Sequence, residues 1–374
     1  AFMNIANDDA FDNKPIIRQI LKYRRDLATI LGYDNFADYQ VEERMVQRGE
    51  VIRNFLEDLS SHTQSYFEVE KTSLIDFAKG LGYEQLSPWD SAYVSEKMRQ
   101  QYFDYEEEKL RPYFPLDNVL KGLFEITARV FGVTVQRVDN AHVWHPDVQF
   151  YELRDVDGSH IGSFYADWFP REEKRSGAWL MPLFIGGKTA AGFEPNVGMI
   201  AANFTSPEGD KPALLSHREV ETVFHEFGHL LHHCLGKVPI KSLGGTSVAW
   251  DFVELPSQIM ENWCWEKDAL DLFAKHYENG ETIPSDLFAR MQAARTFMGA
   301  FQQMRQISLG TTDFKLHVDY NLEDDLLDYV AEINQPFVLY PEFANNSFVT
   351  SFSHIFSGGY ATGYYSYKWA EVLD

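Results

Sequence analysis

Hydrophobic positions in the first third of the chain recur at intervals of three and four residues. The segments that show this spacing are Ile16–Leu31, Glu50–Leu81 and Ser91–Leu110, and glycines and prolines separate them. Such spacing places the apolar side chains on one face of an α-helix. We therefore expect residues 1–130 to form a helical region.

The hydrophobic pattern changes after residue 131. Short segments rich in β-branched and aromatic residues follow, with Gly, Pro and Asp between them, and such segments are typical of strands. The predicted strands are Val133–Val138, Phe150–Arg154, Ile161–Trp168, Trp179–Ile185 and Gly198–Phe204. Helical spacing returns in Ser216–Leu235, Asp268–Tyr277, Pro284–Leu309 and Leu322–Ile333. The sequence thus predicts a mainly α fold with a small β-sheet insert.

One of the later helices carries the sequence His225-Glu226-Phe227-Gly228-His229, an H-E-x-x-H pattern. Ser216 and Glu219 form a capping box at the start of this helix, and Gly236 followed by Pro239 provides a stop. The apolar residues between these limits fall on one stripe, and the histidines fall on the opposite face. The helix therefore presents its histidines away from the core.

The spacing of the two histidines predicts a metal site. His225 and His229 lie one helical turn apart, which lets both imidazoles reach one Zn²⁺ ion. Glu226 lies about 100° around the helix from His225, where its carboxylate can act as a general base on a metal-bound water. The alternative for such histidines is a solvated helix face. Their position opposite the apolar stripe argues against hydrogen-bonded core residues.

A catalytic zinc needs a third protein ligand, for which there are two candidates. His232 lies two turns, roughly 10 Å, along the helix from His225, which is too far for one ion in a straight helix. Glu254 stands before Pro256, and proline is tolerated in the first turn of a helix, so a second helix could deliver this carboxylate. We expect Glu254 to be the ligand. Glu221 and Asp251 are candidates for orienting the histidines, and exposed acids are the alternative for both.

Four ordered motifs resemble the M3 (thimet oligopeptidase-like) family of zinc metallopeptidases. They are Asn203-Phe204, the helix from Glu219 to His229, the stretch from Asp251 to Trp263, and the stretch from Ser353 to Tyr367. The resemblance implies one zinc ion per chain on His225, His229 and Glu254, with Glu226 as the base. It extends more loosely over nearly the whole chain.

Tyrosines dominate the last of these motifs. Tyr360, Tyr364 and Tyr367 recur at i, i+4 and i+7, which predicts a shared helical face after the flexible Gly358-Gly359 pair. An aromatic stripe at helical spacing is commonly part of a core, but beside a zinc site phenol and imidazole groups can also stabilise an oxyanion. The resemblance implies catalytic roles for Tyr367, Tyr360 and His354, and substrate binding by Tyr364, Gly358 and Gly359. In similar enzymes the substrate backbone also pairs with a strand such as Gly198–Asn203, whose alternative is an ordinary buried strand.

Composition limits the partners of the protein. The 374 residues include 33 Lys and Arg against 56 Asp and Glu, a formal charge of −23, which disfavours nucleic acid and anionic membranes as partners. Only two cysteines occur, and the first ten residues lack the features of a secretory signal, so we expect a cytoplasmic protein. The sequence does not begin with Met, so we also expect an upstream segment.

Together these observations predict a zincin-like peptidase of the M3 type. The resemblance implies a deep channel, with residues 1–130 forming part of its wall and residues 131–374 forming the catalytic zinc region, in a chain that is incomplete at both ends. The predicted activity is hydrolysis of internal bonds in short peptides, and the sequence carries no signal for an oligomeric state. The alternatives are a peptidyl-dipeptidase of the same family and a non-catalytic peptide-binding fragment.

Overall fold

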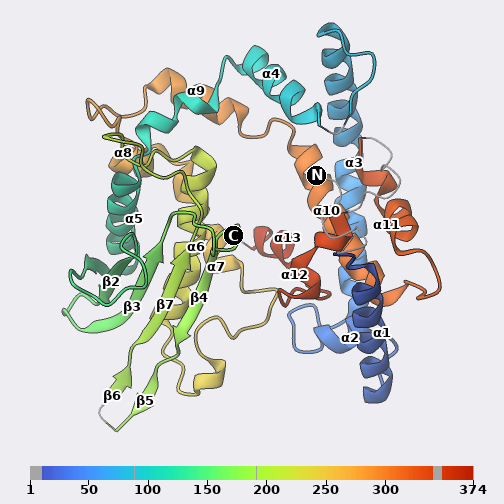
Figure 1. Cartoon of the computed structure of the whole chain (residues 1–374), viewed down its shortest axis with the longest axis horizontal. Coiled ribbons are helices and arrows are strands. Elements are labelled where there is room, and N and C mark those ends of the chain that lie inside the picture. The colour runs from blue at the N-terminus through green and yellow to red at the C-terminus, as the bar shows by residue number, and fades with distance from the viewer. Residues whose placement is uncertain (1–10, 88, 191, 340–347, 374) are drawn as a thin grey trace. The chain divides into compact units, whose positions relative to one another are not determined.

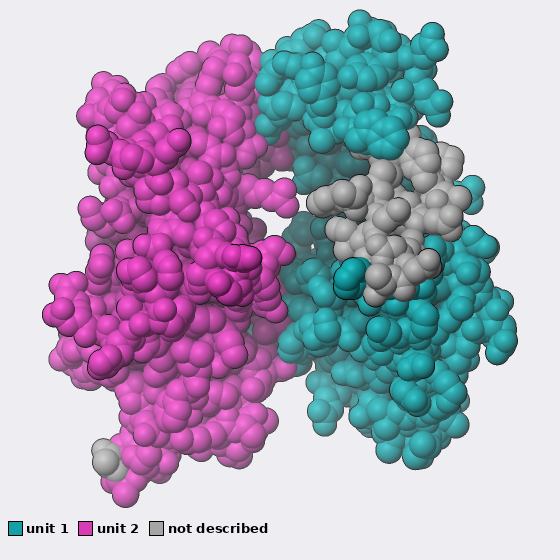
Figure 2. Space-filling model, in the orientation of Figure 1, with its two compact units in different colours: residues 1–102, 249–252, 296–372 teal, residues 103–248, 253–295, 373–374 magenta. Residues whose placement is uncertain are grey.

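A computed structural model describes residues 11–87, 89–190, 192–339 and 348–373. The chain forms two compact units, coloured teal and magenta in Figure 2. Unit 1 comprises residues 1–102, 249–252 and 296–372, and unit 2 comprises residues 103–248, 253–295 and 373–374. Both units are discontinuous in sequence, whereas the sequence analysis divided the chain at residue 130. The functional division into a channel wall and a catalytic region stays a prediction.

Unit 1 is helical. Its α-helices in the described ranges are α1 (Lys14–Leu31), α2 (Phe36–Val41), α3 (Gly49–Gly80), α4 (Ser91–Phe103, of which the last residue is assigned to unit 2), α10 (Gly299–Val318), α11 (Leu326–Asn334), α12 (Ser353–Phe356) and α13 (Ser366–Glu371). The long helices α3 and α10 pack against each other, with the buried Leu56 of α3 against Gly310 of α10. This confirms the helical periodicity of the N-terminal third (Figure 1).

The predicted helix Pro284–Leu309 is wrong in one respect, because two helices occupy this stretch. Helix α9 (Ser285–Ala294) ends before a turn in which Met298 adopts a left-handed conformation (φ +54°). Helix α10 then begins, and the carboxylate of Glu70 accepts hydrogen bonds from the backbone N–H groups of Ala300 and Phe301. This cap comes from α3, so no local pattern indicates the break.

Unit 2 contains the sheet. After α5 (Leu116–Phe131) come β1 (Thr134–Arg137), β2 (Gln149–Arg154), β3 (His160–Asp167), β4 (Trp179–Phe184) and β7 (Asn196–Ala201), close to the five predicted strands. They form one mixed sheet in the order β1-β2-β3-β7-β4, in which β3 and β7 are parallel and the other neighbours antiparallel. A two-stranded hairpin of β5 (Gly187–Thr189) and β6 (Gly192–Glu194) was not predicted, because its strands are short and mostly exposed. The mainly α fold with a small sheet is confirmed.

Helix α6 (His217–Leu235) lies against the sheet, beside α7 (Leu255–Glu261), and α8 (Lys267–Phe273) packs on α5. Leu230 and Cys234 of α6 approach the sheet at Gly198 and Gly162, where a Cβ atom would come within 2.8 Å of each side chain. Phe227 packs among Phe164 and other aromatic rings of the core. The apolar stripe predicted for this helix is thus its sheet-facing side.

A buried carboxylate ends strand β3. Asp167 is 2% exposed and accepts hydrogen bonds from Arg171, Lys174 and the indole N–H of Trp144. Burial alone would raise the pKa of Asp167, but these three donors outweigh it and lower the pKa to about 2. The network fixes the segment that follows the strand.

No helix in the part of the chain that the structure describes is long and apolar enough to cross a membrane. The first ten residues, on which the prediction about a secretory signal rests, lie outside the described residues.

Candidate metal centre

The start of helix α6 is fixed by its own sequence. Ser216 accepts a hydrogen bond from the N–H of Glu219, and the Glu219 carboxylate accepts one from the N–H of Ser216, which confirms the predicted capping box. The helix then runs without a break through the H-E-x-x-H residues to Leu235. Its register determines which side chains face the same side.

Gly228, inside the H-E-x-x-H pattern, lets helix α7 cross very close to α6. A Cβ atom at Gly228 would lie 2.2 Å from the carbonyl oxygen of Pro256 and 2.6 Å from the Cα of Ser257. Both are backbone atoms in the first turn of α7, and Glu254 is the residue that precedes this helix. The absence of a side chain at Gly228 therefore brings Glu254 to the histidines.

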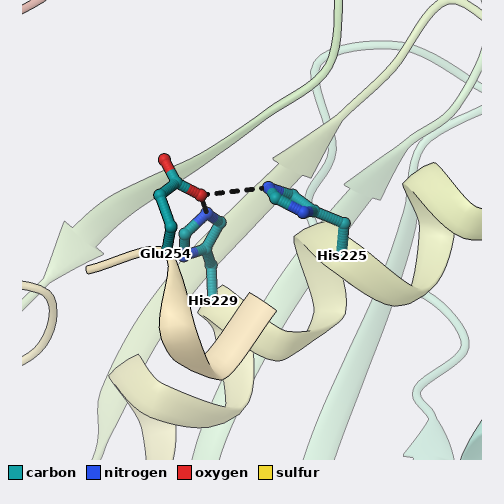
Figure 3. A group of neighbouring side chains, drawn as sticks. All are labelled: His225, His229 and Glu254. Carbon is teal, nitrogen blue, oxygen red and sulfur yellow. Dashed lines mark ion pairs between the residues drawn. The ribbon is translucent and has the colours of Figure 1, made fainter. Parts of the chain in front are cut away.

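Figure 3 shows the result, in which the Glu254 carboxylate points toward both imidazole rings. Its Oε2 atom lies 3.3 Å from Nε2 of His225 and 3.2 Å from Nε2 of His229. The two rings are nearly perpendicular, with centroids 4.9 Å apart. The structure thus brings together His225, His229 and Glu254, and His232 is not part of this cluster.

The cluster fits a tetrahedral metal ion. Ligand bonds of about 2.0–2.1 Å in a tetrahedron place neighbouring ligand atoms about 3.3 Å apart. The two distances from Glu254 match this value, and all three ligand atoms lie within 4.8 Å of one another. Two nitrogens and one carboxylate oxygen form a donor set that zinc accepts, with a fourth position left for water or substrate.

Electrostatics couple the three side chains strongly. Burial alone would lower the pKa of His225, but hydrogen bonds with Glu254 and Glu261 outweigh it and raise the pKa to about 10. Burial would raise the pKa of Glu254, yet the two histidines hold the pKa of its carboxyl well below its usual range. A bound cation would take over the role of the proton on His225, so metal binding would release protons.

Glu261 is a partner of the site that the sequence analysis missed. Its Oε1 lies 2.6 Å from Nδ1 of His225, on the side of the ring opposite Glu254. This contact sets the tautomer that leaves Nε2 free to bind a metal. Glu261 follows Glu254 by seven residues, two turns of one helix, and this spacing is the signal that could have found it.

The two acids that the sequence analysis suggested for this role lie elsewhere. Glu221 accepts a hydrogen bond from Nε1 of Trp265, and burial raises the pKa of Glu221. Asp251 is fully buried in unit 1, where it accepts hydrogen bonds from the N–H of Met45 and the hydroxyl of Tyr365. The structure shows no hydrogen bond from either acid to His225 or His229 among the contacts it describes.

Glu226 is buried beside the cluster, with 6% of its surface exposed. Its Oε2 atom has no hydrogen-bond partner among the described residues. Burial raises the pKa of Glu226, and the two neighbouring histidines act in the opposite direction. A buried carboxylate whose oxygen has no hydrogen-bond partner among the described residues can accept a proton from a substrate or a water molecule.

The tyrosine motif belongs to unit 1 and is described within that unit. The prediction that Tyr360, Tyr364 and Tyr367 share one helix is wrong, because residues 361–365 form turns between α12 and α13. Gly359 (φ +87°) and Thr362 (φ +51°) adopt left-handed conformations that a helix cannot contain. The rings nevertheless meet: Tyr360 stacks on Tyr367 with centroids 5.3 Å apart, and Tyr364 lies 5.2 Å from Tyr367.

His354 joins the same group of rings. Its centroid lies 5.8 Å from that of Tyr360 and 5.7 Å from that of Tyr364. Gly358 is packed against the backbone of His354, where a Cβ atom would be 3.0 Å away. The roles of these residues in substrate binding and catalysis stay predictions.

The strand for which substrate pairing was considered is an inner strand. Strand β7 lies between β3 and β4 and pairs with both, so it offers no free edge to a peptide. Among the described strands, β4 forms the free edge on this side of the sheet, and its Met181, Leu183 and Phe184 are exposed. The alternative of an ordinary buried strand therefore holds for Gly198–Asn203.

The sequence is similar to known proteins over nearly its whole length. The model of Peptidase family M3 matches residues 1–374. Oligopeptidase A of Salmonella typhimurium is 42% identical over 372 residues, which cover 98% of this chain and 55% of that protein. Organellar oligopeptidase A of Arabidopsis thaliana is 40% identical, with 100% of this chain and 49% of that protein covered. Dipeptidyl carboxypeptidase of Escherichia coli is 34% identical, with 98% of this chain and 54% of that protein covered.

The chain thus spans about half the length of these curated relatives. The family match nevertheless covers all of it, including the H-E-x-x-H helix and the tyrosine motif. The chain belongs to peptidase family M3.

Proposed function

We propose that this chain is the zinc-dependent catalytic part of an oligopeptidase that hydrolyses internal bonds of short, unstructured peptides. The observation that carries the proposal is the cluster of His225, His229 and Glu254. Beside it is buried the Oε2 atom of Glu226, which has no hydrogen-bond partner among the described residues. Family M3 is metal-dependent, and the relatives named oligopeptidase A are more similar to this chain than dipeptidyl carboxypeptidase is.

Each side chain of the site has a distinct task in this proposal. A zinc ion held by His225, His229 and Glu254 would polarise a peptide carbonyl and acidify a water molecule. Glu226 accepts the proton of the attacking water and passes it to the leaving amine. Glu261 keeps the His225 ring in the orientation that presents Nε2.

The tyrosine motif would supply the remaining polar groups. Tyr367 and Tyr360 donate hydrogen bonds to the oxygen that becomes negative as water adds to the carbonyl, with His354 as a further donor. Tyr364 and the Gly358-Gly359 pair contact the substrate. The ring contacts among these residues support a common role, since they hold the hydroxyl-bearing side chains as one group.

An extended peptide could pair with the free edge of β4. This strand packs beside α6, the helix that carries Glu226 and both histidines. Main-chain hydrogen bonds along an edge strand recognise a peptide backbone without regard to its side chains. Such binding suits an enzyme that acts on many short sequences.

The proposed deep channel limits the size of the substrate. An extended chain can enter a channel that a folded domain cannot, so peptides of roughly 6–17 residues, about 20–60 Å when extended, should be cut. We expect reduced, unfolded casein to be cut much more slowly than a nonapeptide. Equal rates for the two substrates, followed by mass spectrometry, would contradict the channel.

Product masses test the proposed reaction itself. Free and C-terminally amidated nonapeptides should be cut at the same internal bond and at similar rates, whereas a peptidyl-dipeptidase would release a dipeptide and require the free carboxylate. Glu226→Gln should keep its zinc and lose turnover by at least about 10²–10⁴-fold. A Glu226→Gln variant that works at the wild-type rate would refute the mechanism, and peptide binding without any turnover by the wild-type chain would indicate a peptide-binding fragment.

A further inference from the structure

The turn between Tyr360 and Tyr367 is held by a buried carboxylate from helix α10. Asp313, in the middle of α10, is 1% exposed. One of its oxygens accepts the N–H of Thr362 at 2.9 Å, and the other accepts those of Gly363 and Tyr364 at 2.7 and 2.9 Å. Three successive peptide groups thus point at a single anion, an arrangement that forms only in one backbone conformation.

A buried cation holds the other side of the same turn. Arg44 is 6% exposed and donates hydrogen bonds to the carbonyl oxygens of Ala361, at 3.1 Å, and Thr362. A Cβ atom at Gly363 would lie 2.9 Å from Nη1 of Arg44, so the glycine makes room for the guanidinium. The N–H groups and the carbonyl groups of the turn are therefore bound by opposite charges.

The backbone of the turn is not one that its sequence would favour. Thr362 is β-branched and has φ +51°, a left-handed conformation that costs on the order of 1 kcal/mol or more for such a residue. Such a conformation persists when the surroundings over-determine it. The hydrogen bonds that the turn donates to Asp313 and accepts from Arg44 supply that constraint.

Two further residues lie beside Asp313. Nδ1 of His317 lies 2.7 Å from the backbone oxygen of Asp313 and 3.2 Å from its Oδ1, and Nη1 of Arg24 lies 2.8 Å from Nε2 of His317. Arginine can only donate, so Nε2 accepts and Nδ1 carries the proton that His317 donates. The network continues from α1 through α10 to the tyrosine turn, all within unit 1.

The clamped turn sets the positions of the tyrosine rings on either side. Tyr360 precedes it and stacks on Tyr367, which follows it, with ring planes 9° apart. The Trp250 ring packs against the Tyr360 ring in an edge-to-face arrangement, with centroids 5.0 Å apart, and also against Gly359. A change in the turn would move the two hydroxyls relative to each other, because they are attached on opposite sides of it.

We propose that Asp313 and Arg44 are positioning residues for catalysis, which hold Tyr360 and Tyr367 in the geometry that stabilises the transition state. This inference rests on the proposed function, in which these tyrosines donate to the developing oxyanion. Neither residue touches the substrate in this proposal. They act by keeping the donors in place before the substrate arrives, and misplacement of a catalytic group by about 1 Å can cost about 10²-fold in rate.

The first experiment compares Asp313→Asn with the matched variant Glu70→Gln. Both changes remove a carboxylate that binds backbone N–H groups in unit 1, but Glu70 binds those of Ala300 and Phe301 at the start of α10. We expect Asp313→Asn to lower kcat by at least about tenfold with KM and zinc content nearly unchanged. Glu70→Gln should spare kcat, even where it lowers the melting temperature.

Hydrogen exchange gives a readout that does not depend on turnover. The amides of residues 362–364 should exchange faster in Asp313→Asn than in wild type, and Glu70→Gln should leave them unchanged. Arg44→Lys is the second test variant, to be used if Asp313→Asn does not fold. Lysine keeps the positive charge but lacks the guanidinium group that binds two carbonyl oxygens at once. This variant should show the same pattern of faster exchange and lower kcat.

A double mutant separates positioning from a general loss of stability. If Asp313 acts through the tyrosine hydroxyls, Asp313→Asn should have little further effect on kcat in a Tyr367→Phe background. Fully additive losses, or a normal kcat in Asp313→Asn despite faster exchange, would overturn the positioning role. A Tyr367→Phe enzyme with normal kcat would instead show that the proposed role of the tyrosines is wrong.

Discussion

Replacing Gly228 by alanine should weaken zinc binding strongly while leaving most of the fold intact. The added Cβ would lie 2.2 Å from the carbonyl oxygen of Pro256, about 1 Å inside an ordinary carbon–oxygen contact. The atoms it meets belong to backbone, so the first turn of α7 must move by about that amount. Glu254 directly precedes this turn and must move with it.

The effect on the metal should exceed the effect on stability. Ligand distances tolerate deviations of about 0.2 Å, so a shift of about 1 Å removes Glu254 from the ion. Overpacking costs about 1–3 kcal/mol, and the better helix propensity of alanine offsets about 1 kcal/mol of it. We therefore expect a fall in zinc affinity of at least about 10²-fold in a protein whose melting temperature falls by only a few degrees.

Zinc affinity is measured by competition with a chelator and metal content by mass spectrometry. Gly122→Ala is the matched control, because its Cβ would meet the Phe273 side chain at 2.3 Å, where α5 packs on α8 in the same unit. This variant should lose stability and keep its zinc. Wild-type zinc affinity in Gly228→Ala, or an equal loss of zinc in Gly122→Ala, would refute the reasoning.

Three further predictions follow from the contacts described above. Glu254→Ala should lose the metal and His232→Ala should retain it, as counted by zinc per chain, and full zinc retention in Glu254→Ala would remove it as a ligand. Glu261→Gln weakens the acceptor of the bond to Nδ1 of His225 and should lower zinc affinity by about 10–100-fold, whereas an unchanged affinity would leave Glu261 with no role at the metal. Asp167→Asn should lower the free energy of unfolding by about 2 kcal/mol near pH 7, because the pKa of Asp167 in the folded wild-type protein is lowered to about 2. The stabilisation is present above the unfolded-state pKa of about 4 and is lost as the pH falls toward 2, so denaturant titrations of wild type and variant should converge in acid.

Features that depend on neighbours in sequence were predicted correctly. The capping box of Ser216 and Glu219, the spacing of His225 and His229 and the placement of Glu254 at the start of a helix involve residues within one or two turns of each other. Helical geometry alone relates such residues in space. The same local rule excluded His232 from the cluster.

Features that depend on distant residues were predicted less well. The tyrosine motif reads as a helix, yet Asp313, about fifty residues earlier, holds residues 362–364 in a turn. Strand β7 has the pattern of a buried strand, and nothing in that pattern says that β3 and β4 flank it. In both cases a tertiary contact, and not the local pattern, decides the conformation.

The packing of Cys234 against the sheet gives a way to time the opening of unit 2 alone. Cys234 and Cys264 both lie in unit 2 and are 2% and 0% exposed, and burial raises the pKa of both thiols, to about 12 for Cys234. A thiol reagent attacks the thiolate, so neither cysteine reacts while unit 2 stays folded. The rate of labelling of the native protein therefore measures how often unit 2 opens. A metal ion that binds to folded unit 2 should lower this labelling rate.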